Sequence, residues 1–158
     1  MQRLSKQGDK MKKILLITLV FILAACSFGS SELSRNQQKW QSANIQHYRF
    51  SLNVGCFCAF RSQMPLTVEV LNNEVVSITG ADGNIVGAKD ANYAYYSTYA
   101  TIDRLFVELN SDSVRKADEV TIKYDATYGF PSEVNIDFIK AAMDDELSLN
   151  VSAFEKLP

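Results

Sequence analysis

The pattern of apolar and polar side chains along the chain predicts six β-strands. From His47 to Val54 the sequence reads HYRFSLNV, with an apolar side chain at every second position. The same period of two recurs over residues 66–70, 76–78, 120–124, 134–136 and 147–151. Such alternation is typical of strands that bury one face and leave the other face in contact with water.

The segment PLTVEVLNNEVVSIT, residues 65–79, has the pattern of a β-hairpin. Its first arm has apolar side chains at alternate positions, and on the return arm we expect Val76 and Ile78 to face the core. Between the arms, Asn72 and Asn73 suit a tight turn with positive φ angles.

Two segments have helical spacing. The sequence SRNQQKWQS, Ser34–Ser42, predicts a short helix with Trp40 on its apolar side. Thr101 is suited to cap a second helix that extends to about Lys116. The apolar stripe of this second helix consists of Ile102, Leu105, Phe106 and Leu109.

These elements together predict an α+β fold. We expect an antiparallel sheet of about six strands packed against two helices, in the order αβββ-αβββ. Because each strand has a single apolar face, the helices should cover one side of the sheet. The pattern predicts one domain over residues 34–158.

The N-terminal segment has the pattern of a secretory signal peptide. A basic stretch ending in Lys12 and Lys13 precedes the uncharged run ILLITLVFIL and small residues. The apolar run is shorter than the ~20 residues that a membrane-spanning helix needs. The sequence LAAC, which ends at Cys26, resembles the lipobox of bacterial lipoproteins, and this resemblance implies cleavage before Cys26 and acylation of its thiol.

We therefore expect a lipoprotein signal peptide at residues 1–25 and a flexible tether at residues 26–33. Met1 and Met11 are both possible starts. The resemblance implies a lipid anchor in the cell envelope. Because Ser27 rather than Asp follows the cysteine, it favours the outer membrane, facing the periplasm, in a Gram-negative cell.

Charge narrows the range of partners. The whole chain has 16 basic and 18 acidic residues. Removal of residues 1–25 takes away five basic residues and one acidic residue, which leaves 11 and 17 and a formal charge of −6. An acidic surface argues against nucleic acid as a partner and against electrostatic docking on anionic lipid. The membrane contact is therefore expected through the lipid anchor alone.

Two cysteines remain beside the acylated one. Cys56 and Cys58 lie one residue apart, and in an oxidising compartment we predict a disulfide between them. Residues i and i+2 of an extended strand have Cα atoms ~6.6 Å apart. The strand must therefore end in a tight turn at Cys56, and Gly55 is placed to permit that turn. Free thiols and metal binding are the alternatives.

Two aromatic segments are candidate binding surfaces. Tyr93, Tyr95 and Tyr96 belong to the run ANYAYYSTYA, which either fastens the start of a helix to the sheet or forms a recognition surface. Tyr128 and Phe130 lie in the run YDATYGFP between two predicted strands.

The run YDATYGFP also has a purely structural interpretation. Gly129 is suited to a positive φ angle, and Asp125 is suited to bind backbone amides of the turn. A ligand loop built on the neighbouring aromatic residues is the functional alternative.

No motif indicates catalysis or a cofactor. His47 is the only histidine, lies on the polar side of its strand, and has no nucleophile motif beside it. The acidic run at Asp144, Asp145 and Glu146 lacks the spacing of an EF-hand, so we interpret it as a solvated turn rather than a calcium site. We expect no metal, no cofactor and no enzymatic activity.

Three signatures resemble those of a bacterial family of small lipoproteins that is classed as a domain of unknown function. They are HYRFSLNVGCFC, YDATYGFP and NIDFIKAAMDDEL, and the similarity spans roughly residues 40–154. The resemblance implies a lipid-anchored α+β domain of the cell envelope and no assigned catalysis.

Two hypotheses of function remain. The first is a non-catalytic envelope protein that binds a protein or another envelope component through one sheet face or the tyrosine segment. The alternative is a periplasmic thiol-disulfide or Cu(I)-binding protein that uses Cys56 and Cys58.

Overall fold

The computed structural model describes residues 32–58 and 61–158. Its elements follow the chain in the order α2 (Glu32–Ala43), β1 (His47–Gly55), the 3-10 helix η1 (Arg61–Gln63), β2 (Leu66–Leu71), β3 (Glu74–Thr79), α3 (Tyr93–Ser97), α4 (Ile102–Leu109), α5 (Asp112–Arg115), β4 (Glu119–Tyr124), β5 (Pro131–Asp137) and β6 (Leu147–Lys156). Residues 36–158 form one compact unit, and residues 32–35 begin α2 outside it.

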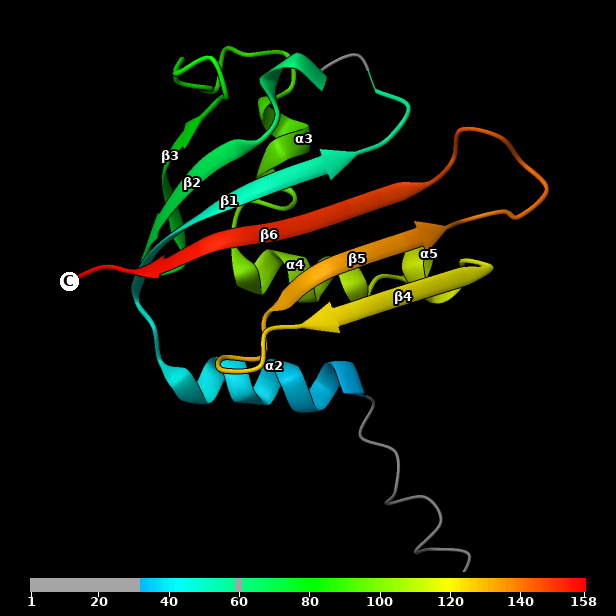
Figure 1. Cartoon of the computed structure of the whole chain (residues 1–158), viewed down its shortest axis with the longest axis horizontal. Coiled ribbons are helices and arrows are strands. Elements are labelled where there is room, and N and C mark those ends of the chain that lie inside the picture. The colour runs from blue at the N-terminus through cyan, green and yellow to red at the C-terminus, as the bar shows by residue number, and fades with distance from the viewer. Residues whose placement is uncertain (1–31, 59–60) are drawn as a thin grey trace, which may run out of the picture. The chain divides into compact units, whose positions relative to one another are not determined.

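The six strands form one antiparallel sheet with the order β3-β2-β1-β6-β5-β4. Strands β1 and β6 are central and join two three-stranded halves (Figure 1). The predicted α+β class and the antiparallel sheet of six strands are confirmed. The described chain has four α-helices where the pattern predicted two.

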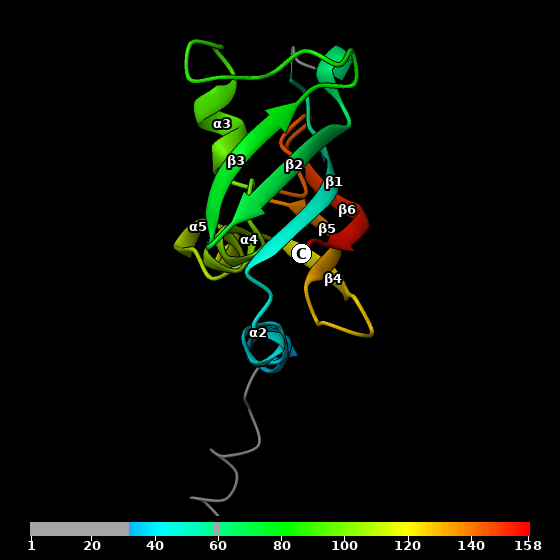
Figure 2. The same ribbon diagram turned by 90° about the vertical axis from the view of Figure 1, so that its left-hand side faces the viewer.

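One face of the sheet is covered by helices and the other is not. Helices α3, α4 and α5 lie against the same side of the strands, as Figures 1 and 2 show. The covered face holds the alternating apolar side chains of β1, β5 and β6, and each of the following is buried: Tyr48, Phe50, Leu52, Val54, Val134, Ile136, Leu147, Leu149 and Val151. No described helix covers the opposite face, which we call the open face, and its strand positions are mostly polar.

The predicted turns are confirmed. Asn72 and Asn73 have φ angles of 51° and 62°, and Gly129 has a φ angle of 81°. The Asp125 carboxylate accepts hydrogen bonds from the amides of Thr127 and Tyr128, at 3.0 and 2.5 Å. These residues tolerate or stabilise left-handed backbone, which is why local sequence was sufficient to predict them.

The helix predicted from Thr101 to about Lys116 is two short helices. Thr101 caps α4 as expected, since its Oγ1 accepts a hydrogen bond from the Arg104 amide at 3.1 Å. However, α4 ends at Leu109, and Ser111 caps α5 through the Val114 amide at 3.2 Å. Ser and Asn side chains compete for backbone hydrogen bonds, and this local competition interrupts the helix.

Two expectations from the sequence pattern, one for β3 and one for the start of α2, are wrong. Val76 does not face the core: its exposed fraction is 55%, because a register shift between Glu69 and Val70 leaves it as the extra residue of a bulge in β3. Helix α2 begins at Glu32, so Glu32 and Leu33 are helical rather than part of a tether.

Candidate functional site

Strand β1 ends in a turn closed by Cys56 and Cys58. The two sulfur atoms are bonded, the Cα atoms are 5.2 Å apart, and the Cys58 amide donates to the Cys56 carbonyl at 2.8 Å. The predicted tight turn is thus present. Gly55 has a different role from the predicted one, because its φ angle is not positive. A Cβ atom on Gly55 would lie 2.3 Å from the Ser148 Oγ, so glycine permits close approach of β6.

The turn presents an aromatic side chain to solvent. Phe57, between the two cysteines, is 75% exposed. Underneath, the Tyr95 hydroxyl lies 3.8 Å from the Cys56 Sγ, within reach of a weak hydrogen bond. The Phe57 ring is therefore an apolar side chain that is accessible for contact at this turn.

A hollow of about 480 Å³ lies beside this turn, and we call it the turn hollow. It is lined by Asn53, Val54, Gly55, Cys56, Phe57, Met64, Asp144, Glu146 and Ser148. Its lining combines the exposed aromatic ring and a thioether with amide, hydroxyl and carboxylate groups. No basic residue is among these lining residues.

A second hollow of about 300 Å³ lies between β4, β5 and β6, and we call it the strand hollow. It shares Glu146 and Ser148 with the turn hollow and also has Glu119 and Asp137 in its lining. The strand register explains why the two hollows adjoin. Ser148 of β6 pairs with Gly55 of β1 on one side and with Asn135 of β5 on the other. Both hollows therefore lie at the same end of the sheet, where β1 and β5 finish and β6 begins (Figure 1).

Negative charge is incompletely compensated there. Among the described residues, Asp137 Oδ1 and both carboxylate oxygens of Asp145 are buried without a hydrogen-bond partner. Burial, and then the charges of Asp145, Glu146 and Asp118, raise the pKa of the Asp137 carboxyl. In the predicted solvated turn, Asp144 and Glu146 are exposed, whereas Asp145 is partly buried with both carboxylate oxygens inaccessible. Within the described ranges, no three His, Cys, Asp or Glu side chains are arranged to hold a metal ion.

Within the tyrosine segment, Tyr96 is buried and does not belong to an exposed recognition surface. Tyr96 has an exposed fraction of 0%, and its hydroxyl donates to the Gln63 Oε1 at 2.5 Å. Burial raises its pKa to about 12. Tyr93 and Tyr95 are partly exposed, so the short helix α3 contributes Tyr96 to the core. The structural interpretation therefore holds for Tyr96, and the recognition surface stays a prediction for Tyr93 and Tyr95.

Tyr128 and Phe130 are likewise structural. Phe130 is 4% exposed, and its ring centroid lies 4.8 Å from that of Phe154 and 6.2 Å from that of Trp40. Tyr128 is half-buried with its ring 5.6 Å from Phe154. These rings, with Tyr48, form an aromatic cluster that packs the later part of α2 against the sheet, so Phe130 is not available as part of a ligand loop.

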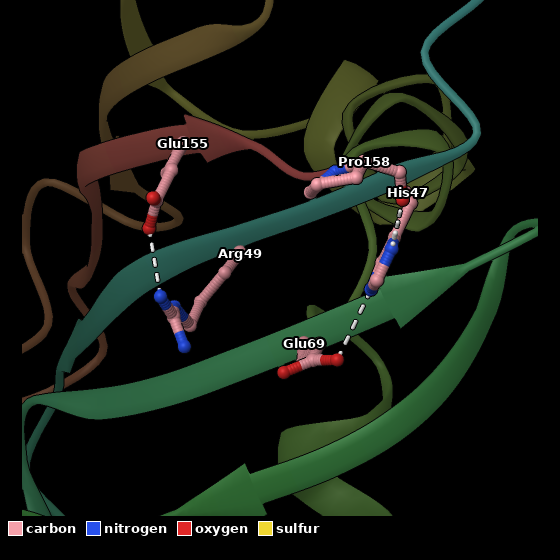
Figure 3. A network of polar contacts seen from close by, with 5 residues as sticks. All are labelled: His47, Arg49, Glu69, Glu155 and Pro158. Carbon is pink, nitrogen blue, oxygen red and sulfur yellow. Dashed lines mark hydrogen bonds and ion pairs between the residues drawn. The ribbon is translucent and has the colours of Figure 1, made fainter.

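His47 and Arg49 form a polar network at the other end of the open face (Figure 3). The His47 Nδ1 lies 2.8 Å from the main-chain oxygen of Pro158, and its Nε2 lies 3.1 Å from the Glu69 Oε1. Arg49 pairs with Glu155 at 2.8 Å. The bond to Pro158, and then the bond to Glu69, raise the pKa of His47.

Sequence reasoning missed both the histidine network and the acidic hollows. The pattern placed His47 on the polar side of its strand, but it did not reveal that only a quarter of the side chain is exposed and that both ring nitrogens have partners. The sequence did contain one signal for these features, because many polar positions of the strands hold charged side chains. The partners come from different strands, so only the strand order brings them together.

The predicted signal peptide, the acylation of Cys26 and the tether up to residue 31 lie outside the described residues. Across residues 32–58 and 61–158, no helix is long and apolar enough to cross a membrane.

Comparison with known protein families gives a match over nearly all of the described chain. Residues 32–156 match the family of unknown function DUF6174. No curated protein matches the chain. The matched range covers every described helix and strand, from α2 to β6, and so includes the disulfide turn and both hollows. The chain belongs to the DUF6174 family.

Proposed function

We propose that this chain is a non-catalytic, lipid-anchored protein of the bacterial cell envelope that binds a partner through the turn hollow. The observation that carries the proposal is Phe57, which is 75% exposed on a turn closed by the Cys56–Cys58 pair at the rim of a 480 Å³ hollow. A closed turn holds the ring in place before binding, and this preorganisation reduces the entropy lost on association.

Other features support a binding role. The hollow combines an aromatic anchor with convergent polar groups, the usual composition of a recognition site. The signal-peptide pattern and the sequence LAAC support the envelope location. Acylation at Cys26 would hold the chain close to the bilayer, because only residues 27–31 separate it from α2.

In vivo crosslinking tests the proposal. The full-length protein and its Phe57→Ser variant are expressed in the native host, crosslinked, and purified with their partners. We expect the parent to capture a specific envelope component and Phe57→Ser to lose it, with little change in stability because the ring is exposed. Val107→Ser is a matched control, since Val107 is 69% exposed on α4 and lies outside the hollow. Equal capture by both variants would contradict the proposal.

The second candidate is a thiol-disulfide or Cu(I)-binding protein. It is favoured by the Tyr95 hydroxyl 3.8 Å from the Cys56 Sγ, which would stabilise a thiolate, and by the thioether of Met64 in the same hollow. Intact mass of envelope-purified protein, alkylated without reductant, separates the candidates. Two added alkyl groups, or one bound copper per chain, would favour the second candidate. No alkylation until reductant is added would favour the first.

A further inference from the structure

Another hollow lies at the opposite end of β1 from the turn hollow, and we call it the amide hollow. Its volume is about 240 Å³, and its lining comes from the end of α2, the start of β1, the turn between β2 and β3, and the first turn of α4. Strand β1 has nine residues. At ~3.3 Å per residue, its length of about 26 Å separates the two hollows. The amide hollow is therefore distinct from the site of the proposed function.

Four carboxamide side chains line the amide hollow, and all four belong to exposed residues: Gln41, Asn44, Gln46 and Asn73. The Gln46 Nε2 donates to the Asn44 Oδ1 at 2.8 Å. Among the described residues, the side chains of Gln41 and Asn73 have no hydrogen-bond partner. Since each carboxamide has two donor hydrogens and an acceptor oxygen, most of this bonding capacity is open to a ligand.

Backbone hydrogen bonds hold the segments that carry these carboxamides. The Asn72 amide donates to the Gln46 main-chain oxygen at 2.7 Å, which joins the turn between β2 and β3 to the start of β1. The Asn44 amide donates to the Gln41 main-chain oxygen at 3.2 Å at the end of α2. The walls are thus in place before a ligand arrives, and this preorganisation reduces the entropy lost on binding.

The floor of the amide hollow is apolar with one acidic group. It consists of the buried residues Trp40, Ile45 and Tyr48, which are 4%, 7% and 1% exposed. The Trp40 Nε1 donates to the Asp103 Oδ2 at 3.3 Å, and Asp103 is partly exposed. A carboxylate has further acceptor positions beyond one such bond. The floor therefore offers apolar contact for C–H groups beside an acceptor for a hydroxyl group.

The composition and size of the amide hollow decide which ligand fits. None of its lining residues is basic, so an anion would find no cationic partner and would be repelled by Asp103. A hydroxyl group both donates and accepts, as a carboxamide does, so a compound with several hydroxyl groups matches the four carboxamides. The volume lies below the about 300–1,000 Å³ of sites for drug-sized ligands. One sugar ring suits this space better than an extended chain does.

We propose that the amide hollow binds one neutral sugar ring, with the carboxamides of Gln41 and Asn73 bonding its hydroxyl groups and Asp103 accepting from another hydroxyl. This inference goes beyond the proposed function, because it assigns a ligand to a separate site. An N-acetylated sugar adds an amide group, which can pair with a carboxamide as both donor and acceptor. N-acetylglucosamine is therefore a suitable probe.

Intrinsic fluorescence tests the inference directly, because Trp40 is the only tryptophan of the chain and lines the hollow. The full-length protein, in a detergent without a sugar headgroup, is titrated with N-acetylglucosamine. We expect a saturable change in emission with a Kd of about 1 mM, as for a small neutral ligand. The variant Gln41→Ala/Asn73→Gly should bind about tenfold more weakly, from the loss of two hydrogen-bonding side chains. Glycine retains the turn, since it accepts the φ angle of 62° at position 73.

The matched control removes the same two residue types from the same two elements. Gln38→Ala/Asn72→Gly replaces exposed carboxamides that do not line the hollow, and Asn72 also has a positive φ angle, 51°. Its Kd should stay within about twofold of that of the parent. Equal weakening in both double variants would overturn the inference. Thermal melting checks that each variant is folded.

A comparison of ligands on the parent protein is independent of any variant. Glucuronate should bind at least about fivefold more weakly than glucose, because its carboxylate is repelled by Asp103 and meets no basic residue in the lining. Tighter binding of chitotetraose than of N-acetylglucosamine would identify a glycan chain as the source of the ring. Equal or weaker binding would identify a free sugar, and either result supports the inference.

Three further outcomes would overturn it. The first is no saturable response to any of these sugars, and the second is tighter binding of glucuronate than of glucose. The third is a saturable response to tetra-alanine alone that Gln41→Ala/Asn73→Gly removes, because the hollow would then recognise peptide amides. Phe57→Ser should leave sugar binding unchanged, so this inference and the proposed function can fail separately.

Discussion

At the scale of single residues, His47 shows how bonding partners define a protonation state. Both partners of its ring, the Pro158 main-chain oxygen and the Glu69 carboxylate, are acceptors. A neutral imidazole has one N–H and can donate to only one of them, whereas the imidazolium donates to both. The network in Figure 3 is therefore complete only when His47 is protonated.

This arrangement predicts a pH dependence. The pKa of His47 is raised in the folded protein, so its contribution to stability is fully present below about pH 6.5 and is lost as the pH rises through the folded pKa. NMR titration should place the pKa of this single histidine above 6.5. Glu69→Gln should lower that pKa, while Glu133→Gln, on the same face but paired with Lys123, should leave it unchanged. A histidine that titrates at or below 6.5 in the parent would refute the argument.

At the scale of elements, α3 and α4 are held by buried polar contacts as well as by apolar packing. The Tyr48 hydroxyl of β1 accepts the Ile102 amide at 3.1 Å at the start of α4. The Tyr96 hydroxyl of α3 reaches Gln63 in η1, whose main-chain oxygen also accepts the Ala81 amide at 3.0 Å. Each helix is thus tied to the sheet or its connections by one tyrosine.

Truncation of Tyr96 should therefore be strongly destabilising. We expect Tyr96→Ala to reduce the free energy of unfolding by about 3–5 kcal/mol, as for other large buried aromatic residues. Val107→Ala, on the exposed side of α4, should change it by less than about 0.5 kcal/mol. Urea denaturation followed by circular dichroism measures both. Similar midpoints for the two variants would show that α3 does not contribute to the core as described.

In the loop that joins β4 to β5, Gly129 is the residue whose replacement we expect the packing to tolerate least. Its φ angle is 81°, and an added Cβ would lie 2.8 Å from the Asn36 main-chain oxygen in α2. We expect Gly129→Ala to reduce the free energy of unfolding by at least about 1 kcal/mol, from left-handed backbone strain alone. Gly83→Ala is the control, since Gly83 has the same φ angle with open space around it, and Gly129→Ala should be the more destabilising of the two.

At the scale of the whole molecule, the proposed lipid anchor would determine where the proposed binding takes place. Cys26→Ser should abolish acylation and release the protein from membranes as a soluble or uncleaved product. Fractionation of cells, followed by intact-mass measurement of the N-terminus, tests this expectation. A Cys26→Ser protein that is processed and remains in the membrane fraction like the parent would contradict the lipid anchor.

Much of the fold was predictable because its signals are local. The period of two identified the faces of the strands, and Asn72, Asn73, Gly129 and the Thr101 cap were recognised from residue chemistry alone. The errors have a common origin in long-range geometry. The bulge exposed Val76, and Tyr96 and Phe130 were taken as possible surface residues because nothing local reveals what packs over them.

The sequence by itself determined the class of fold and the covered faces of the strands, and it predicted the pairing of two neighbouring cysteines, since each depends on residues within a few positions of one another. The tertiary structure decided the candidate site. Glu119, Asp137 and Glu146 lie on three different segments, and only the order β1-β6-β5-β4 brings them to one end of the open face. Strand order is set by packing and hydrogen bonding between distant segments, so charges that meet across it leave no local pattern.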